Sequence, residues 1–409
     1  MMSAVHDMAA ESAVRDATTA ESAPEFSWDL YESREAIEQI RPEWESLLES
    51  HPNASRNAEP QRLLDTLEAI GAGGSPAVLL IRNGRTPCAV LVGRTEQSRI
   101  RCRLGYFKPR TPRLRTFKLM YGGCVGVDDD AVARTAADAI RSLIASKRFE
   151  CVFTNKLDCD SAFMSLLAAD DRSVQREIRP HWVTELTPHS YEQTLSGHSS
   201  KHRSNLRRLD RKLCAHFDGE VELRIVTSEA DVDSYVESMR SIFEQTYKAG
   251  IAQDQMMGLD WAKALKSRAA AGELRSYLLV GGGKPIAYQT GSLHRGVYSA
   301  EGTAYLPEFS SLRPGTVLMM RVMQDLCDQG AHVIDWGFGD AEYKRLYGTR
   351  SWNEAALHVY GDSVRSRVAR LMDRMSVAAS VRGKKAVGSG LTSRIKRWWR
   401  DRAARKAAS

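Results

Sequence analysis

Residues Tyr298–Tyr347 read YSAEGTAYLPEFSSLRPGTVLMMRVMQDLCDQGAHVIDWGFGDAEYKRLY. The alternation at the start of this stretch predicts a half-buried strand. The sequence Leu312–Thr316 predicts a helix start, because the missing N–H of proline is not needed in a first turn. One apolar helix face then recurs at spacings of three and four, at Met319, Val322, Met323 and Leu326. Gly330 ends the helix, and Ala331–Trp336 predicts a short strand that carries Asp335 near its end.

The start of this helix is a candidate phosphate site. A helix N-terminus offers free N–H groups and the positive end of a dipole. Gly315 would let the backbone approach a phosphate closely, with the N–H groups of Gly315, Thr316 and Val317 directed at it. The expected cofactor-binding residues are therefore Arg313, Pro314, Gly315, Thr316 and Val317. The alternative is an ordinary Pro-Gly helix start without a ligand.

Three motifs of this stretch carry a family resemblance: Pro314-Gly315, the DWGFGD of Asp335–Asp340, and Tyr343-Lys344. They resemble the acetyltransferase-like family associated with bacterial cellulose and exopolysaccharide gene clusters, a branch of the GNAT acyl-CoA N-acyltransferase superfamily. The resemblance implies an α/β (α+β) fold with two tandem GNAT-type lobes, each a mixed, mostly antiparallel sheet flanked by helices. It also implies acyl transfer from acetyl-CoA or another acyl-CoA. The Gly-rich pyrophosphate loop of GNAT enzymes is reduced here to Arg313-Pro314-Gly315.

The whole chain divides into two series of similar elements. The order strand, two helices, three-strand meander, helix, strand, short helix, strand is expected once in residues 26–187 and again in 221–362. The first copy lacks a comparable polar cluster, so we interpret it as a degenerate lobe that shapes the cleft. Residues 1–25 are expected to be a disordered leader because they are small and polar. Residues 363–409 are expected to be a basic amphipathic tail.

Residues 188–220 are expected to join the two lobes as a basic helix. The segment from Gly197 to Cys214 contains six Lys/Arg, with leucines at 206, 209 and 213 on one stripe. One interpretation is a solvated helix that bridges the lobes. In the other, cations such as Lys201 and Arg203 face the cleft and hold an anionic substrate or CoA phosphates. A comparable helix links the lobes of the Fem-type aminoacyl transferases, which this chain resembles less closely.

Candidate catalytic residues lie on the strands next to the helix start. GNAT enzymes often place a base on the strand that here carries Glu301, although a residue of an alternating strand could equally face solvent. Asp335 is the second candidate base, because a carboxylate at a strand end commonly lines a ligand crevice. Its alternative role is to cap the Gly337–Gly339 turn or to pair with Lys344. The choice between the two carboxylates stays open.

Three further side chains are weaker candidates. Tyr343 could donate a proton toward sulfur or pack in the core, and Lys344 could stabilise an oxyanion or pair with Asp335 or Asp340. Gln289, on an adjacent strand, could contact the substrate. We expect no metal site, because the His residues are scattered and no ligand spacing is present.

Composition and charge indicate the class of protein and its expected location in the cell. A hydrophobic content of 43% with 27% charged residues is typical of a globular protein, and no run of 18 apolar residues is present. Seven cysteines without a CxxC pair favour reduced thiols and the cytoplasm. Residues 363–409 carry a net charge of +12 and contain Trp398-Trp399. This combination favours peripheral contact with an anionic inner membrane. A flexible solubilising tail is the alternative, and nucleic acid is a less favoured partner.

The function that these features favour is transfer of an acetyl or longer acyl group from acyl-CoA to an amine or hydroxyl. The acceptor is expected to be a small molecule or a glycan or lipid-linked intermediate of polysaccharide or cell-envelope synthesis. A Fem-type aminoacyl or peptidyl transferase is the alternative within enzymes. A non-catalytic accessory protein of a polysaccharide synthase is the alternative outside them.

Overall fold

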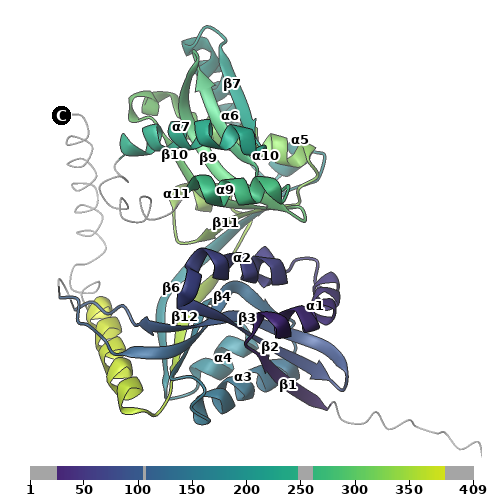
Figure 1. Ribbon diagram of the computed structural model, residues 1–409. Coiled ribbons are helices and arrows are strands. Elements are labelled where there is room, and N and C mark those ends of the chain that lie inside the picture. Colours follow the sequence, from purple (N-terminus) through teal and green to yellow (C-terminus); the bar gives the residue numbers. More distant parts are fainter. Residues whose placement is uncertain (1–24, 105–106, 247–260, 383–409) are drawn as a thin grey trace, which may run out of the picture.

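The computed structural model describes residues 25–104, 107–246 and 261–382 (Figure 1). The leader predicted over residues 1–25 and the second half of the predicted tail therefore lie almost entirely outside the described residues. The elements of the first half are β1 (Phe26–Tyr31), α1 (Arg34–Glu49), η1 (Arg56–Ala58), α2 (Pro60–Ile70), η2 (Gly71–Gly73), β2 (Gly74–Asn83), β3 (Thr86–Arg99), β4 (Arg113–Val125), α3 (Asp130–Ala145), β5 (Cys151–Asp158), α4 (Ala162–Ala168) and β6 (Ser173–Glu185).

The second half repeats this order after two helices. Its elements are α5 (Tyr191–Ser196), α6 (Ser200–His216), β7 (Val221–Val226), η3 (Glu229–Asp231), α7 (Val232–Glu244), α9 (Trp261–Ala270), β8 (Ser276–Gly281), β9 (Lys284–His294), β10 (Val297–Tyr305), η4 (Pro307–Leu312), α10 (Pro314–Asp328), β11 (Val333–Phe338), α11 (Glu342–Tyr347) and β12 (Arg350–Tyr360). A further helix covers residues 364–382.

All twelve described strands form one continuous sheet in the order β1-β2-β3-β4-β5-β12-β6-β11-β10-β9-β8-β7. Neighbouring strands are antiparallel except at β4–β5 and β10–β11, the corresponding positions of the two halves. The predicted fold class, two tandem lobes with mixed, mostly antiparallel sheets and flanking helices, is confirmed.

The last strands of the two halves are exchanged at the centre of the sheet. β12 lies between β5 and β6, and β6 lies between β12 and β11. Figure 1 shows β6, β11 and β12 crossing between the two halves. The ranges 26–187 and 221–362 therefore describe segments of sequence, whereas each half of the sheet is completed by a strand from the other segment.

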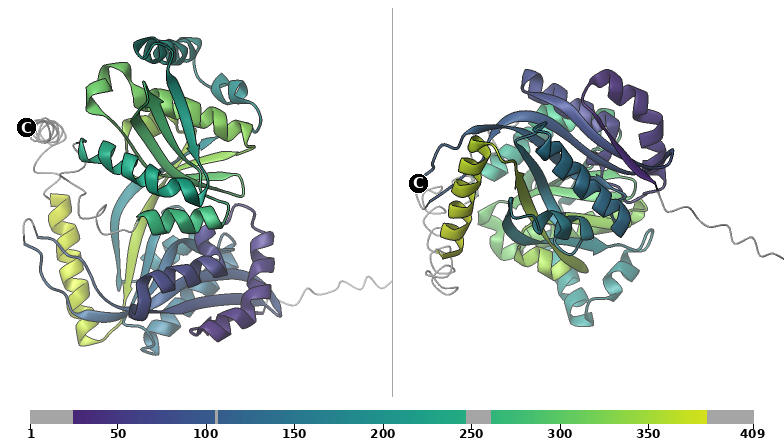
Figure 2. Two further views of the ribbon diagram at one scale, coloured as in Figure 1. Left: turned by 45° about the horizontal axis from the view of Figure 1, so that its top comes forward. Right: turned by 90° about the horizontal axis from the view of Figure 1, so that it is seen from below.

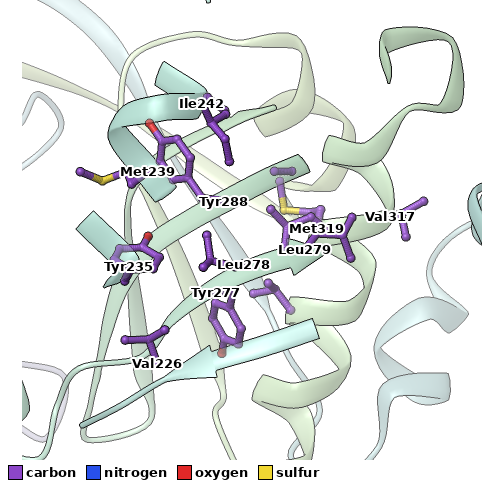
Figure 3. Close-up of a cluster of buried hydrophobic side chains, with 14 of the residues drawn as sticks. Val226, Tyr235, Met239, Ile242, Tyr277, Leu278, Leu279, Tyr288, Val317 and Met319 are labelled. Atoms are coloured by element: carbon purple, nitrogen blue, oxygen red, sulfur yellow. The ribbon is translucent and has the colours of Figure 1, made fainter. Parts of the chain in front are cut away.

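Helices cover both faces of each half. In the first half, α3 and α4 cover one face, and α1 and α2 contact β2 and β3 on the other. In the second half, α7 and α10 enclose the strands within one buried cluster. Figure 3 shows Tyr235 and Met239 of α7 on one side of strand residues such as Leu278, with Val317 and Met319 of α10 on the other.

The first part of the predicted tail is docked on the body of the protein. Helix 364–382 lies beside the first half (Figure 2) and buries Ala369 in a small cluster with Cys102 and Tyr360. The buried carboxylate of Asp373 accepts a hydrogen bond from the Tyr360 hydroxyl at 2.7 Å and forms an ion pair with Arg176. This helix is therefore not a free tail.

No helix in the described part of the chain is long and apolar enough to span a membrane.

Candidate active site

The sheet opens between β10 and β11, directly before the predicted site. The two strands pair only from Val297–Ser299 to Val333–Asp335, after which β11 pairs with β6 alone. On β10 the register shifts between Ala300 and Gly302, so that Glu301 lies in a bulge. Asp335 thus occupies the last paired position before the two strands separate.

Helix α10 begins beside this opening. Arg313 has a left-handed φ of 55°, and no side chain caps the first turn. The N–H groups of Thr316 and Val317 donate to the carbonyl of Arg313, at 3.0 and 3.3 Å. Of the three expected phosphate donors, only Gly315 therefore keeps its N–H outside the hydrogen bonds of the helix. The side chain of Val317 is buried in the core, and its N–H is used within the helix.

Helix α3 of the first half corresponds to α10, and the residues at its start disfavour anion binding. Asp129 caps α3, and its Oδ1 accepts hydrogen bonds from the N–H groups of Ala131 and Val132. Asp128 and Asp130 add negative charge to the same turn. A phosphate would meet occupied donors and three carboxylates there, whereas α10 starts with an arginine.

The basic helix α6 packs on the second half rather than between the halves. Leu206 and Leu213 are buried, and Arg321 of α10 forms an ion pair with Asp210 at 2.9 Å. The Nζ of Lys212 lies 3.2 Å from the carbonyl of Ser311, just before α10. Helix α6 thus follows the first half in sequence and packs on α10, with Lys212 close to the start of α10; the predicted binding of an anion by its cations stays a prediction.

The two predicted binding residues of α6 differ in accessibility. Lys201 is exposed and lines a hollow of about 630 Å³ together with His202 and Arg208. The guanidinium of Arg203 donates to the carbonyl of His198 within its own segment. Lys201 therefore remains available to an anion, and Arg203 serves to hold the turn before α6.

Asp335 is bonded to a histidine from the other half of the sequence. Its Oδ1 accepts hydrogen bonds from Nε2 of His181 on β6, at 2.6 Å, and from the N–H of Gly337, at 2.7 Å. Gly337 has a φ of 69°, which turns the chain back toward the carboxylate. Asp335 therefore caps this turn, as one alternative predicted, and is also part of a polar cluster. Its Oδ2 has no hydrogen bond from the described residues.

His181 is buried at the centre of this cluster. Its Nδ1 lies 2.9 Å from the Tyr121 hydroxyl on β4 and 3.2 Å from Oε1 of Glu354 on β12, and its ring stacks on Trp352 at 4.4 Å. Burial alone would lower the pKa of His181, but the hydrogen bonds and charges of Asp335 and Glu354 outweigh it and raise the pKa to about 9. The imidazole is therefore cationic at neutral pH.

Lys156 adds a second cation next to this cluster. It stands on β5 with a φ of 58°, and its Nζ lies 5.0 Å from the ring centre of Tyr121 and 4.7 Å from that of Phe338. Burial lowers the pKa of this ammonium, while Glu354 and Asp335 oppose the shift. Strands β4, β5, β6, β11 and β12 thus bring one compact set of charged and aromatic groups together.

The other predicted catalytic residues have structural partners. Glu301 forms an ion pair with Arg268 of α9, at 2.6 Å. Tyr343 packs its ring edge-on against Trp336, at 6.0 Å between centroids, so the predicted core-packing alternative describes its place.

Lys344 and Gln289 are buried. The Nζ of Lys344 donates to the carbonyls of Gly337 and Phe338, at 3.1 and 3.2 Å, and burial lowers its pKa. It therefore closes the turn after Asp335 rather than pairing with Asp335 or Asp340. Gln289 is only 4% exposed and donates to the carbonyl of Thr290, so the predicted substrate contact is corrected to a role inside the sheet.

Four members of the cluster were not predicted: Tyr121, Lys156, His181 and Glu354. Each is a polar residue within a strand, and His181 and Glu354 interrupt otherwise ordinary strand sequences. A buried ionisable residue in a strand is a usable signal of a site. The sequence could not show that these four meet, because β12 and β6 reach their places beside β5 and β11 only through the exchange of the two strands.

Glu59, Glu273 and His294 form the described cluster whose residue types could hold a metal ion. His294 lies 2.9 Å from Glu59 and 3.0 Å from Glu273. Hydrogen bonds to these two carboxylates raise the pKa of His294 to about 9, against the effect of burial. As the structure stands, these three side chains form an ion-pair cluster between the two halves.

The fold is an α/β architecture with two parallel strand pairs that separate at one end, and an uncapped helix start and a carboxylate lie beside the second pair. Residues 200–345 match the model of a family described as "Acetyltransferase (GNAT) domain". This part of the chain, from α6 into α11, is therefore similar in sequence to GNAT acetyltransferase domains.

Similarity to whole proteins is more distant. No curated protein matches the sequence. Similar solved structures include a tandem GNAT protein from the clavulanic acid biosynthesis pathway, with 12% identity, 83% of this chain and 100% of that chain covered, and a TM-score of 0.48. FemX has 12% identity, coverage of 81% and 98%, and a TM-score of 0.44. L-PGS from Bacillus licheniformis has 11% identity, coverage of 71% and 86%, and a TM-score of 0.40.

Proposed function

We propose that this protein transfers an acetyl or longer acyl group from acyl-CoA to an amine or hydroxyl, with the donor held by the second half. The observation that carries the proposal is the position of Asp335 in the GNAT domain. Its carboxylate stands where β10 and β11 separate, and it is held by His181 and Gly337 through one oxygen alone.

The start of α10 suits the phosphates of CoA. The first turn lacks a side-chain cap, Gly315 keeps a free N–H, and Arg313 is exposed beside it. Lys212 and Lys201 of α6 add positive charge to this side of the second half. Bound acyl-CoA would supply an activated thioester, and these residues would hold its anionic part.

Asp335 is the residue that we assign to proton transfer. Its Oδ2 would accept the proton that the acceptor nitrogen or oxygen loses as it bonds to the acyl carbon. His181 is almost fully buried and cannot reach an acceptor, so it is a positioning residue. It fixes Oδ1 through its Nε2–H, while Glu354 and the Trp352 ring fix the imidazole.

Thermal melting with acetyl-CoA, a long-chain acyl-CoA and free CoA tests the donor. A ligand at 100 times its Kd should stabilise the protein by about 2.7 kcal/mol. If none of the three changes the melting temperature, the assignment of a CoA donor is wrong.

Substitution of the two carboxylates tests the base. Asp335→Asn should keep acyl-CoA binding and lose most turnover, on the order of 100-fold or more. Glu301→Gln should retain turnover, because Glu301 is paired with Arg268. Asp340→Asn removes an exposed carboxylate of the same segment and is the matched control. Full activity of Asp335→Asn would exclude this residue as the base.

We place the acceptor in polysaccharide or cell-envelope synthesis, and the support is the resemblance of Asp335–Asp340 and its flanking motifs to the family named above. Mass spectrometry of products formed from acyl-CoA with panels of amino sugars and hydroxylated glycans distinguishes N- from O-acylation. Modification of small unrelated amines alone would argue against this placement.

We also place the protein in the cytoplasm, at an anionic membrane surface. Helix 364–382 exposes an apolar stripe of Val364, Val368, Leu371 and Met375 on the side that does not dock. Five arginines lie along the same helix, at 365, 367, 370, 374 and 382, and its one carboxylate, Asp373, is buried in an ion pair. Apolar side chains flanked by arginines suit the interface of an anionic bilayer.

Sedimentation with vesicles tests this placement. The protein should bind phosphatidylglycerol vesicles and not phosphatidylcholine vesicles, and a Val368→Glu/Leu371→Glu variant should bind at least tenfold more weakly. Ile225→Glu, which changes an exposed apolar residue of β7, is the control. Equal binding of the double variant and the wild type would show that this helix is not the docking surface.

A further inference from the structure

The first half contains a cavity of about 260 Å³ next to the active-site cluster. It lies where β4 and β5 separate: these parallel strands pair only from Thr116–Lys118 to Cys151–Phe153. The cavity is lined on the sheet side by Lys118, Tyr121, Phe153 and Asn155, and on the helix side by Arg62 of α2 and by Asn57. It therefore occupies in the first half the position that the proposed donor site occupies in the second.

The lining of this cavity carries excess positive charge. Lys118 and Arg94 share a single carboxylate, Glu96. Arg62 has no carboxylate partner among the described residues, and its closest side-chain contact is Oδ1 of Asn57, at 3.4 Å. Three cations thus face one anion.

Arg62 sits in surroundings that favour an added anion. Burial lowers the pKa of its guanidinium, and the nearby charges of Arg56 and Arg268 lower it further. The carboxylates of Asp65 and Glu301 act in the opposite direction, but they are bonded to Gln61 and Arg268. A half-buried guanidinium without a counterion is costly, and its planar fork matches the oxygens of a phosphate.

The cavity is joined to the proposed base by a short chain of hydrogen bonds. Tyr121 lines the cavity, and its hydroxyl lies 2.9 Å from Nδ1 of His181, whose Nε2 bonds to Asp335. A molecule anchored in the cavity would therefore be held on the side of the sheet from which the cluster can be reached. An acceptor needs such an anchor, because the opening between β10 and β11 is assigned to the donor.

We propose that this cavity binds a phosphate group of the acyl acceptor, held by the guanidinium of Arg62 with the amides of Asn57 and Asn155. The proposal rests on the acyl transfer proposed above. Phosphate fits better than carboxylate because the lining has an excess of two positive charges, which a dianion neutralises and a monoanion does not. The first half then carries the acceptor site, and the second carries the donor site.

Titration with inorganic phosphate tests the proposal on the full-length protein. At constant ionic strength, phosphate should raise the melting temperature and give a measurable Kd by calorimetry, whereas acetate and chloride should not. Arg62→Gln should weaken phosphate binding at least tenfold, Arg62→Lys should weaken it less, and Asn155→Ala should weaken it while leaving Arg62 in place. Arg85→Gln removes an exposed arginine of the same half and should change nothing.

The outcomes separate this proposal from the proposed function. Acyl-CoA binding should be unchanged in Arg62→Gln, and with a phosphorylated acceptor its KM should rise more than its kcat falls. Equal phosphate binding by Arg62→Gln, Asn155→Ala and the wild type, or an equal response to acetate, would overturn the phosphate site. Phosphate binding without any acyl-CoA binding would keep the cavity and refute the acyl transfer.

Discussion

At the scale of single residues, His181 lies at the centre of the candidate active site and holds its two carboxylates in place. A buried imidazole between two carboxylates is stable as a cation, because Asp335 and Glu354 each accept one of its N–H groups, at 2.6 and 3.2 Å. Its charge also keeps the two acids, which stand on β11 and β12 of the second half of the sequence, close to one another, while His181 itself comes from the first half. The candidate base is therefore held from both halves at once.

Replacing His181 by glutamine should change the pH dependence of stability. The folded pKa of about 9 lies above the ordinary value of 6.5, so the contribution of His181 is fully present below about pH 6.5 and is lost as the pH rises through 9. The stability advantage of the wild type over His181→Gln should thus shrink by roughly 3 kcal/mol between pH 6 and pH 10. Urea unfolding of both proteins at several pH values measures this difference in the free energy of unfolding.

His294, whose pKa is also raised to about 9, is present in both proteins and cancels in the difference. A difference in stability that does not vary with pH would show that His181 is not held as a cation.

At the scale of elements, the two equivalent helix starts differ in a way that fits the different roles proposed for the two halves. Helix α3 is closed by Asp129 and surrounded by acids, whereas α10 starts with Arg313 and has no side-chain cap. The same position in the fold thus has a side-chain cap in the first half and none in the second. The first half instead keeps its positive charge in the cavity of Arg62.

Asp129→Ala should separate these two roles. The loss of the cap on α3 should reduce the stability by about 1 kcal/mol, because the N–H groups of Ala131 and Val132 lose their acceptor. Acyl-CoA binding should be unaffected, since the donor is assigned to α10. Denaturant unfolding and calorimetric titration measure the two effects; a marked loss of acyl-CoA binding would point to a donor site in the first half.

At the scale of the whole molecule, the exchange of β6 and β12 joins the two halves into one sheet. Neither half completes its strands without the other, and His181 and Glu354 of the polar cluster lie on the exchanged strands. The ion-pair cluster of Glu59, Glu273 and His294 adds a second link away from the sheet.

The chain should therefore unfold in a single cooperative transition. Phe117 is buried in the core of the first half, and Phe117→Ala should lower the stability by about 3–5 kcal/mol. Hydrogen exchange should then speed up in β8 and β9 of the second half as well as in β3. Two resolved calorimetric transitions, or faster exchange confined to the first half, would contradict this coupling.

The sequence by itself determined the features that depend on neighbouring residues. The spacing of Met319 and Val322 specifies α10, and the Pro314-Gly315 start specifies its first turn, as the structure has them. The strand that follows carries Asp335 as predicted, but it runs from Val333 to Phe338 and so continues beyond Asp335. The repeated element order likewise predicts two tandem lobes, because each element is set by local hydrophobic periodicity. Asp335 could be singled out for the same reason.

Only the tertiary structure decided which residues surround Asp335. His181, Tyr121 and Glu354 lie far from it in sequence, and they meet because β6 and β12 pair across the halves. Likewise, α6 has an apolar stripe that could have covered several surfaces, and only packing against α10 selects one. Strand pairing and helix docking depend on which whole faces become buried against each other, and these faces come from distant parts of the sequence. The spacing of neighbouring residues therefore contains no information about them.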